Sequence, residues 1–233
     1  MLTKDMIQGL LSLYERPSYL EIGVFKGATF VPIEAARKVG VDPNFLFDAD
    51  AMRAQQPNAE LHSCTSDEYF GRIVDPDERF DVIFLDGLHT FEQTLRDLNN
   101  AIFFLKPDGV VRVDDVIPTS WGASIKTMAE SYRVKDLIGE LAQDGNWMGD
   151  VYRLVFYVDS FFQQFTFRTL ADNHGQLIGW RSRRTSVPER DVEAISRLTY
   201  ADVLQQRDMY RLTPFQEVRA EVQQHVQASR RAR

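Results

Sequence analysis

Short apolar strands alternate with amphipathic helices through the first half of this chain. The clearest strand covers 80–86, and its centre is continuously apolar, as expected of a strand that is covered on both faces. After it, apolar side chains recur every three or four residues through 91–105, which is typical of an amphipathic helix. Strand and helix alternate five times in this way, which predicts an α/β doubly wound sheet.

The same patterns assign the other expected elements. In the first half we expect helices at 3–14, 29–39, from 66 onward and 91–105, and strands at 18–23, 41–43, 59–64, 80–86 and 110–114, with a turn at 106–109. In the second half we expect helices at 125–141 and 151–162, a hairpin of strands 165–170 and 176–180, a mobile connection at 181–190 and helices over the last forty residues. The β-branched and aromatic content of 151–162 is also compatible with a strand.

Composition limits the class of protein. The 233 residues suffice for one large domain, or for one domain with a modest helical extension. A net charge of −7 argues against a general nucleic-acid binder. Cys64 is the single cysteine, which excludes an intramolecular disulfide, and its apolar surroundings favour a buried small side chain over a nucleophile. There is no apolar run of about 18 residues, so we expect no membrane span and a cytoplasmic protein.

A glycine-punctuated acidic turn follows the first strand. Glu21, Gly23 and Gly27 form the pattern E-x-G-x-x-x-G, and glycine lets the backbone approach a ligand closely. The spacing differs from the G-x-G-x-x-G of dinucleotide-binding loops, and no Gly-Lys-Ser/Thr of a P-loop is present. An acidic residue here would repel a pyrophosphate but suits a cationic, amino-acid-like ligand.

Acidic residues also follow the second and third expected strands. Asp42 lies 19 residues after Gly23, where a carboxylate can accept hydrogen bonds from ribose hydroxyls; the alternative is a solvated aspartate in a turn. Asp67 could accept from an adenine amino group, although Ser66 and Asp67 could equally cap a helix.

Three carboxylates and an imidazole end the next two strands. Asp86 closes one strand, and Asp114 and Asp115 close its neighbour. Acids grouped in this way repel one another unless a cation or a proton intervenes, and oxygen ligands suit Mg²⁺, Mn²⁺ or Ca²⁺. The alternative is that Asp86 and Asp115 only order their own turns. His89, three residues past Asp86, is placed to act as a general base.

With these residues assembled, the chain resembles the class I S-adenosylmethionine (SAM)-dependent methyltransferases, and more closely the macrocin- and mycinamicin-type small-molecule O-methyltransferases. The resemblance covers about residues 15–182 and rests on the motifs at 19–29, 39–43, 65–67, 80–89 and 113–115. It implies a seven-stranded, mostly parallel Rossmann-like sheet with helices on both faces. It also implies a methyltransferase domain at 1–182 and a helical C-terminal extension at 183–233.

The resemblance implies a role for each matching residue. Glu21, Gly23 and Gly27 would shape the pocket for the methionyl part of SAM, Asp42 would bind its ribose, and Ser66 and Asp67 would flank its adenine. Asp86 would contribute to cofactor binding and, with Asp114 and Asp115, would bind a divalent metal such as Mg²⁺, while His89 would be the catalytic base. Relatives of the sugar-methylating type usually carry Glu-Asp where this chain has Asp114-Asp115. Trp121, Trp147 and Met148 would either line the acceptor site or belong to the core.

These observations predict a SAM-dependent O-methyltransferase that acts on a small hydroxylated molecule, of sugar or natural-product type, with metal assistance. We expect neither nucleic acid nor membrane as a partner, and exposed apolar residues such as Phe161 make a homo-oligomer plausible. Two alternatives stay open: a non-catalytic SAM-fold binding or assembly protein, and an NAD-linked oxidoreductase, against which the glycine spacing counts.

Overall fold

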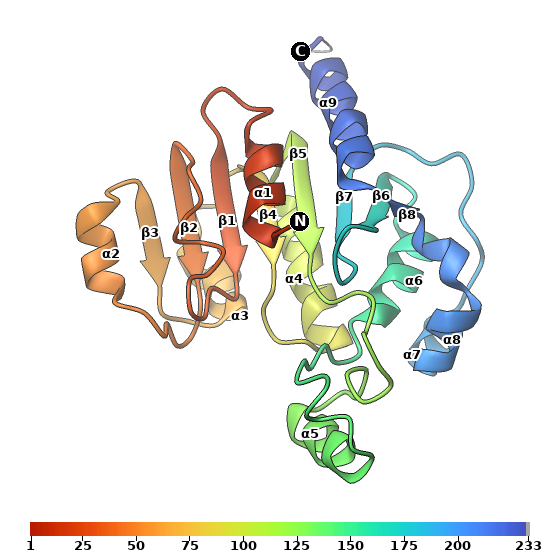
Figure 1. Ribbon diagram of the computed structural model, residues 1–233. Coiled ribbons are helices and arrows are strands. Elements are labelled where there is room, and N and C mark those ends of the chain that lie inside the picture. Colours follow the sequence, from red (N-terminus) through yellow and green to blue (C-terminus); the bar gives the residue numbers. More distant parts are fainter. Residues whose placement is uncertain (232–233) are drawn as a thin grey trace.

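The computed structural model describes residues 1–231, which form a single mixed sheet of eight strands (Figure 1). The strand order is β3-β2-β1-β4-β5-β7-β6-β8. Strands β1 to β5 run parallel, β7 is antiparallel to β5 and β6, and β8 is parallel to β6. The bounds are β1 (Ser18–Ile22), β2 (Arg37–Val41), β3 (Ala59–His62), β4 (Phe80–Leu85), β5 (Leu105–Val113), β6 (Phe165–Leu170), β7 (Leu177–Arg181) and β8 (Leu212–Thr213).

Helices cover both faces of this sheet. On one face, α1 and α9 pack together against β4 and β5, and on the other α4 packs against β4, β5 and α6. The helices are α1 (Thr3–Leu11), α2 (Ala49–Gln55), α3 (Ser66–Glu68), α4 (Phe91–Phe104), α5 (Met128–Leu137), α6 (Tyr152–Phe161), α7 (Val192–Ser196), α8 (Tyr200–Gln205) and α9 (Phe215–Arg231). A π-helical turn (Tyr69–Ile73) follows α3, and a 3₁₀ turn (Arg207–Tyr210) follows α8. The predicted doubly wound α/β fold is confirmed, with β8 as an additional eighth strand.

The helix predicted at 29–39 and the strand predicted at 41–43 are wrong. An irregular segment leads directly from β1 into β2, which ends at Val41. Pro32 stands inside the predicted helix, and proline removes a helical hydrogen-bond donor. The fully buried Lys38 replaces the missing helical bonds, because its Nζ donates to three main-chain oxygens at 2.8–3.1 Å, those of Phe30, Val31 and Ile33.

Smaller differences occur later in the chain. The predicted turn at 106–109 lies inside β5, where the register against β4 shifts between Phe80 and Val82. Helix α5 is shorter than predicted, whereas α4, α6 and the β6–β7 hairpin confirm the expected elements. The connection at 182–190 has no helix or strand, yet its Arg184 is buried against α6, where Nη1 pairs with Asp159 at 2.9 Å.

The residues beyond 182 join the same sheet. Strand β8 pairs with β6, and α9 buries four apolar side chains (Phe215, Val218, Val222 and Val226) in the core beside α1. A domain boundary at 182 therefore stays a prediction. Within the part of the chain that the structure describes, no helix combines the length and apolar character needed to cross a bilayer.

Candidate active site

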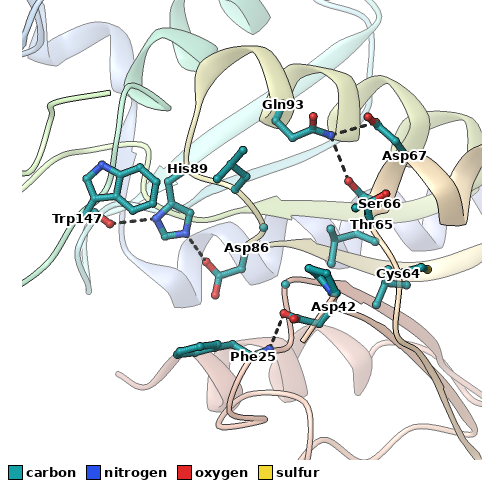
Figure 2. Close-up of a pocket in the computed structure, with 16 residues that line it drawn as sticks. Phe25, Asp42, Cys64, Thr65, Ser66, Asp67, Asp86, His89, Gln93 and Trp147 are labelled. Carbon is teal, nitrogen blue, oxygen red and sulfur yellow. Dashed lines mark hydrogen bonds and ion pairs between the residues drawn. The ribbon is translucent and has the colours of Figure 1, made fainter. Parts of the chain in front are cut away.

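A pocket of about 650 Å³ opens at the carboxyl ends of β1, β2 and β4 (Figure 2). Gly23 makes this arrangement possible, because its φ is +89° and a Cβ at this position would lie 1.9 Å from the main-chain oxygen of Asp86. The ends of β1 and β4 can therefore approach closely only with glycine here. The lining residues are Ile22, Gly23, Phe25, Val41, Asp42, Pro43, Cys64, Thr65, Ser66, Asp67, Asp86, Gly87, Leu88, His89, Gln93 and Trp147.

Asp42 lines this pocket from the residue after β2. Its Oδ2 accepts a hydrogen bond from the Phe25 amide at 2.8 Å (Figure 2), and its Oδ1 accepts from the Asn44 amide at 2.7 Å. The side chain is buried, so it is not the solvated turn aspartate of the alternative interpretation. Two backbone amides fix the carboxylate, and each oxygen keeps a lone pair for a ligand hydroxyl.

Ser66 and Asp67 line the pocket from the segment that follows β3. Thr65, rather than either of them, caps α3, since its side chain accepts from the Glu68 amide. Gln93 of α4 was not singled out from the sequence, yet its Nε2 lies 3.2 Å from Ser66 Oγ and 3.1 Å from Asp67 Oδ1. Gln93 thereby connects α4 to this segment, a contact that sequence spacing does not reveal.

Two of the residues predicted to bind the cofactor, Glu21 and Gly27, do not line the pocket. Glu21 is buried beneath it and accepts a hydrogen bond from the Tyr19 hydroxyl at 2.5 Å. Burial raises the pKa of Glu21 well above its ordinary value, against the opposing effect of the Tyr19 hydrogen bond. Gly27 lies further along the turn, beside Val31 and Phe47.

His89 stands between two carboxylates. Its Nε2 is 3.3 Å from Asp86 Oδ1, and its Nδ1 is 2.9 Å from Asp115 Oδ2 and 3.0 Å from the Trp147 carbonyl oxygen. Burial lowers the pKa of His89, but the hydrogen bonds with Asp115 and Asp86 outweigh it and raise that pKa to about 11. Burial and the charge of Asp114 raise the pKa of Asp86 to about 7, although His89 opposes them.

Trp147 and Gly149 hold the loop that carries His89. The Trp147 ring stacks on the imidazole, with centroids 5.3 Å apart, while its indole N–H donates to the Ile125 carbonyl oxygen. A Cβ on Gly149 would lie 1.6 Å from the His89 main-chain oxygen, so only glycine permits this contact. Of the three expected wall residues, Trp147 lines the pocket, Met148 is buried and Trp121 is exposed.

The sequence shows no acidic residues next to His174, which predicts a structural or solvent-facing side chain. That prediction is wrong, because His174 lies against the pair Asp114 and Asp115. Its Nε2 is 2.8 Å from Asp114 Oδ1 and 3.8 Å from Asp115 Oδ1. The buried Gln176 donates to the same Asp114 oxygen at 2.7 Å. The cause is the β6–β7 hairpin, whose antiparallel pairing with β5 brings a residue 60 positions away to the end of β5.

The acidic residues form two groups that share Asp115. Asp86, His89 and Asp115 offer ligand atoms within 4.8 Å of one another, and so do Asp114, Asp115 and His174. The three aspartates predicted as one metal site are thus divided between two triads, each completed by a histidine. Carboxylate oxygens with one imidazole fit a divalent cation such as Mg²⁺ or Mn²⁺. Asp115 has a φ of +58°, a left-handed conformation that is often found at functional sites.

Comparison with known proteins adds to this geometry. Residues 20–116 match the model of a family described as a methyltransferase domain, which spans β1 to the end of β5. None of the curated proteins compared with the sequence matches it.

Solved structures share the fold. A protein from Staphylococcus aureus assigned as a caffeoyl-CoA O-methyltransferase is 18% identical, with 78% of this chain and 84% of that chain covered and a TM-score of 0.55. The O-methyltransferase TomG from Streptomyces achromogenes, involved in tomaymycin synthesis and solved in complex with SAM, is 17% identical, with 76% and 78% covered and a TM-score of 0.50. Likeness at these identities concerns the fold alone.

A third structure concerns the closer resemblance predicted from the sequence, to the macrocin- and mycinamicin-type O-methyltransferases. It is the MycE methyltransferase of the mycinamycin biosynthetic pathway, 15% identical, with 76% of this chain and 48% of that chain covered and a TM-score of 0.44. This likeness is too low to carry an argument, so the resemblance to that particular group stays a prediction.

Proposed function

We propose that this chain is a class I SAM-dependent methyltransferase and that it transfers a methyl group from SAM to a hydroxyl group of a small molecule. One observation carries the proposal. A single pocket of about 650 Å³ has Asp42 at the end of β2 and the Asp86–His89 pair after β4. An acid suited to bind ribose and a pair suited to accept a proton thus line the same cavity, at the sheet edge where ligands of α/β folds bind.

The proposed cofactor position follows the lining residues. Asp42 would accept hydrogen bonds from the ribose hydroxyls, and Ser66 and Asp67 would flank the adenine, together with Gln93. Gly23 would allow the methionyl part to pass close to the backbone, while Asp86 would close the pocket. Glu21 and Gly27 would act indirectly, by shaping the turn beneath the ligand.

The Asp86–His89 pair is suited to take up the acceptor's proton. His89 Nδ1 donates to the Trp147 carbonyl oxygen, so Nε2, which faces Asp86, is the nitrogen that exchanges a proton. A pKa of about 11 keeps a proton on Nε2 of His89 at neutral pH, and a pKa of about 7 leaves Asp86 able to exchange a proton with it. When that proton lies on Asp86, Nε2 can receive the proton of the attacking hydroxyl.

A divalent metal would assist this chemistry. Asp114 and Asp115 with His174 are the residues that would hold it while His89 acts as the base. In the other triad, of Asp86, His89 and Asp115, a metal would occupy the imidazole that the base requires. When bound, a metal such as Mg²⁺ supplies positive charge that lowers the pKa of a coordinated hydroxyl group and orients it. The protein's own contribution is to hold both substrates in line, which is a large part of catalysis for an activated methyl donor.

The test is a transfer assay with methyl-labelled SAM and a panel of hydroxylated sugars and phenols, with and without Mg²⁺. The proposal is supported if the wild-type protein transfers the label to an acceptor and the His89→Gln variant does not. Tight SAM binding without transfer to any acceptor would instead favour a non-catalytic SAM-binding protein. Binding of NADH in place of SAM would favour the oxidoreductase.

A further inference from the structure

We propose that the methyl acceptor binds in a second pocket beside Asp115, and that Arg207 recognises an anionic group on that acceptor. This inference rests on the function proposed above. It assigns to the acceptor a single hydroxylated ring with a carboxylate, as in a phenolic acid or a sugar acid.

Asp115 lies between the two pockets and contacts one lining residue of each. His89 lines the first pocket and contacts Oδ2 of Asp115, whereas His174 lines the second and lies 3.8 Å from Oδ1 of the same carboxylate. A hydroxyl group that reaches past His174 therefore approaches the side chain that also contacts His89. This places the acceptor on the side of Asp115 that the cofactor pocket leaves free.

Three segments far apart in the sequence build the walls. They are the loop after β5, the β6–β7 turn and the C-terminal segment with α8 and β8, which lies beyond the matched methyltransferase segment. The pocket measures about 270 Å³, just below the range of sites for drug-sized ligands, so it suits a one-ring molecule. Its lining residues are Ile117, Pro118, Thr119, Leu170, Ala171, Asn173, His174, Gly175, Tyr200, Val203, Leu204, Arg207 and Leu212.

Arg207 gives this pocket its charge preference. Its side chain is exposed at the pocket, and no carboxylate of residues 1–231 lies within ion-pair distance of it. By contrast, Arg197 and Arg211 of the same C-terminal segment pair with Glu193 and Asp159. In a protein with a net charge of −7, an unpaired guanidinium beside a small pocket selects an anionic ligand.

The two pockets together define the transfer. The acceptor carboxylate lies at Arg207, and its hydroxyl points toward His174 and Asp115. The acceptor oxygen forms a bond to the methyl carbon as the sulfur–methyl bond of SAM breaks. The hydroxyl proton passes to Asp115, whose other carboxylate oxygen contacts His89, and the products are the methyl ether and S-adenosylhomocysteine (SAH).

Calorimetric titration of the SAH-saturated protein tests the proposal with two matched pairs of probes, 4-hydroxybenzoate against phenol and glucuronate against glucose. We expect the acid of at least one pair to bind about tenfold tighter than its neutral partner. The first pair identifies a phenolic acid and the second a sugar acid. Arg207→Gln should abolish this advantage, Arg197→Gln should keep it, and Leu204→Trp, at a half-exposed lining position, should weaken binding of both partners.

Other results would overturn the proposal. If SAH binds but neither acid does, or if Arg207→Gln leaves the preference for the acid unchanged, the acceptor site lies elsewhere while the proposed methyltransferase function stands. If SAH itself does not bind, the proposed function fails, and the acceptor assignment fails with it.

Discussion

At the scale of single residues, the chemistry of this site depends on one imidazole between two acids. His89 contacts Asp86 through one nitrogen and Asp115 through the other. The motif that places His89 three residues after a strand-ending aspartate is visible in the sequence. The second half of the constellation, His174 with Asp114, was not predictable, because it depends on how the β6–β7 hairpin pairs with β5.

Replacement of His89 by glutamine separates its chemical role from a structural one. Glutamine can keep one hydrogen bond, to the Trp147 carbonyl oxygen, but cannot take up a proton. We expect the turnover rate to fall by about 10²- to 10⁴-fold, while SAM affinity stays within about threefold of wild type. The measurements are kcat and the Kd for SAM. An equal loss in both would show that His89 supports the fold of the pocket instead.

Asp115 belongs to both candidate metal triads, so its substitution tests them together. The affinity for Mn²⁺ can be measured by electron paramagnetic resonance. We expect the wild-type protein to bind Mn²⁺, and the Asp115→Asn variant to bind it at least about tenfold more weakly. Asp97→Asn is a matched control, since Asp97 is a buried acid near the pocket but in neither triad. Equal Mn²⁺ affinity in all three proteins would place any metal elsewhere.

At the scale of elements, the predictable strands are those with a continuous apolar core. Strand β4 and helix α4 lie where the hydrophobic period puts them. The helix predicted at 29–39 failed because long-range contacts replace helical bonds there: Lys38 serves three carbonyl oxygens, and the Gln8 amide pairs with both main-chain groups of Glu34. Such contacts cannot be read from local spacing.

The junction of β1 and β4 provides a test of the backbone geometry. Gly23→Ala would force a Cβ to within 1.9 Å of the Asp86 main-chain oxygen at a φ of +89°. We expect it to lower the free energy of unfolding by at least about 3 kcal/mol. Gly87→Ala is the control, because a Cβ there meets its nearest neighbour, Ile22, at an ordinary 3.4 Å. Denaturant unfolding of both variants checks this, and similar stabilities would contradict the described junction.

The segment around α5 lies beyond the carboxyl edge of the parallel strands (Figure 1). Its stability depends on the contacts of Asp144. Asp144 accepts hydrogen bonds from Thr119 and Ser120 and pairs with the fully buried Lys135 at 3.0 Å. Burial raises the pKa of Asp144, but its bonds to Lys135, Thr119, Asn146 and Ser120 outweigh it and lower that pKa to about 2. The folded state therefore binds fewer protons than the unfolded state between about pH 4 and pH 2.

We accordingly expect the stabilisation by Asp144 to be complete above about pH 4 and to disappear as the pH falls toward about 2. Relative to Asp144→Asn, the wild-type protein should be more stable by about 1 kcal/mol at pH 6, a figure reduced for partial solvent screening. Unfolding free energies from pH 2 to pH 6 measure this difference. The exposed Asp136→Asn serves as control, and a difference independent of pH would refute the assignment.

At the scale of the whole molecule, the chain adds a C-terminal segment to the sheet of β1 to β7. Strand β8 extends the sheet beside β6, α9 packs with α1, and α8 helps to wall the second pocket. The class of the fold could be predicted from strand–helix alternation alone. The position of this segment could not be predicted, because the sequence of its short helices does not indicate which element they pack against.

The proposed function depends most directly on whether the pocket at the carboxyl ends of β1, β2 and β4 binds SAM. Calorimetric titration of wild-type protein and Asp42→Ala with SAM and with SAH tests this. We expect micromolar binding to wild type, and at least about tenfold weaker binding to Asp42→Ala with an unchanged unfolding transition, since a buried charged acceptor for the ribose is lost. No binding of either compound to the wild-type protein, or equal binding to both proteins, would contradict the cofactor site described here.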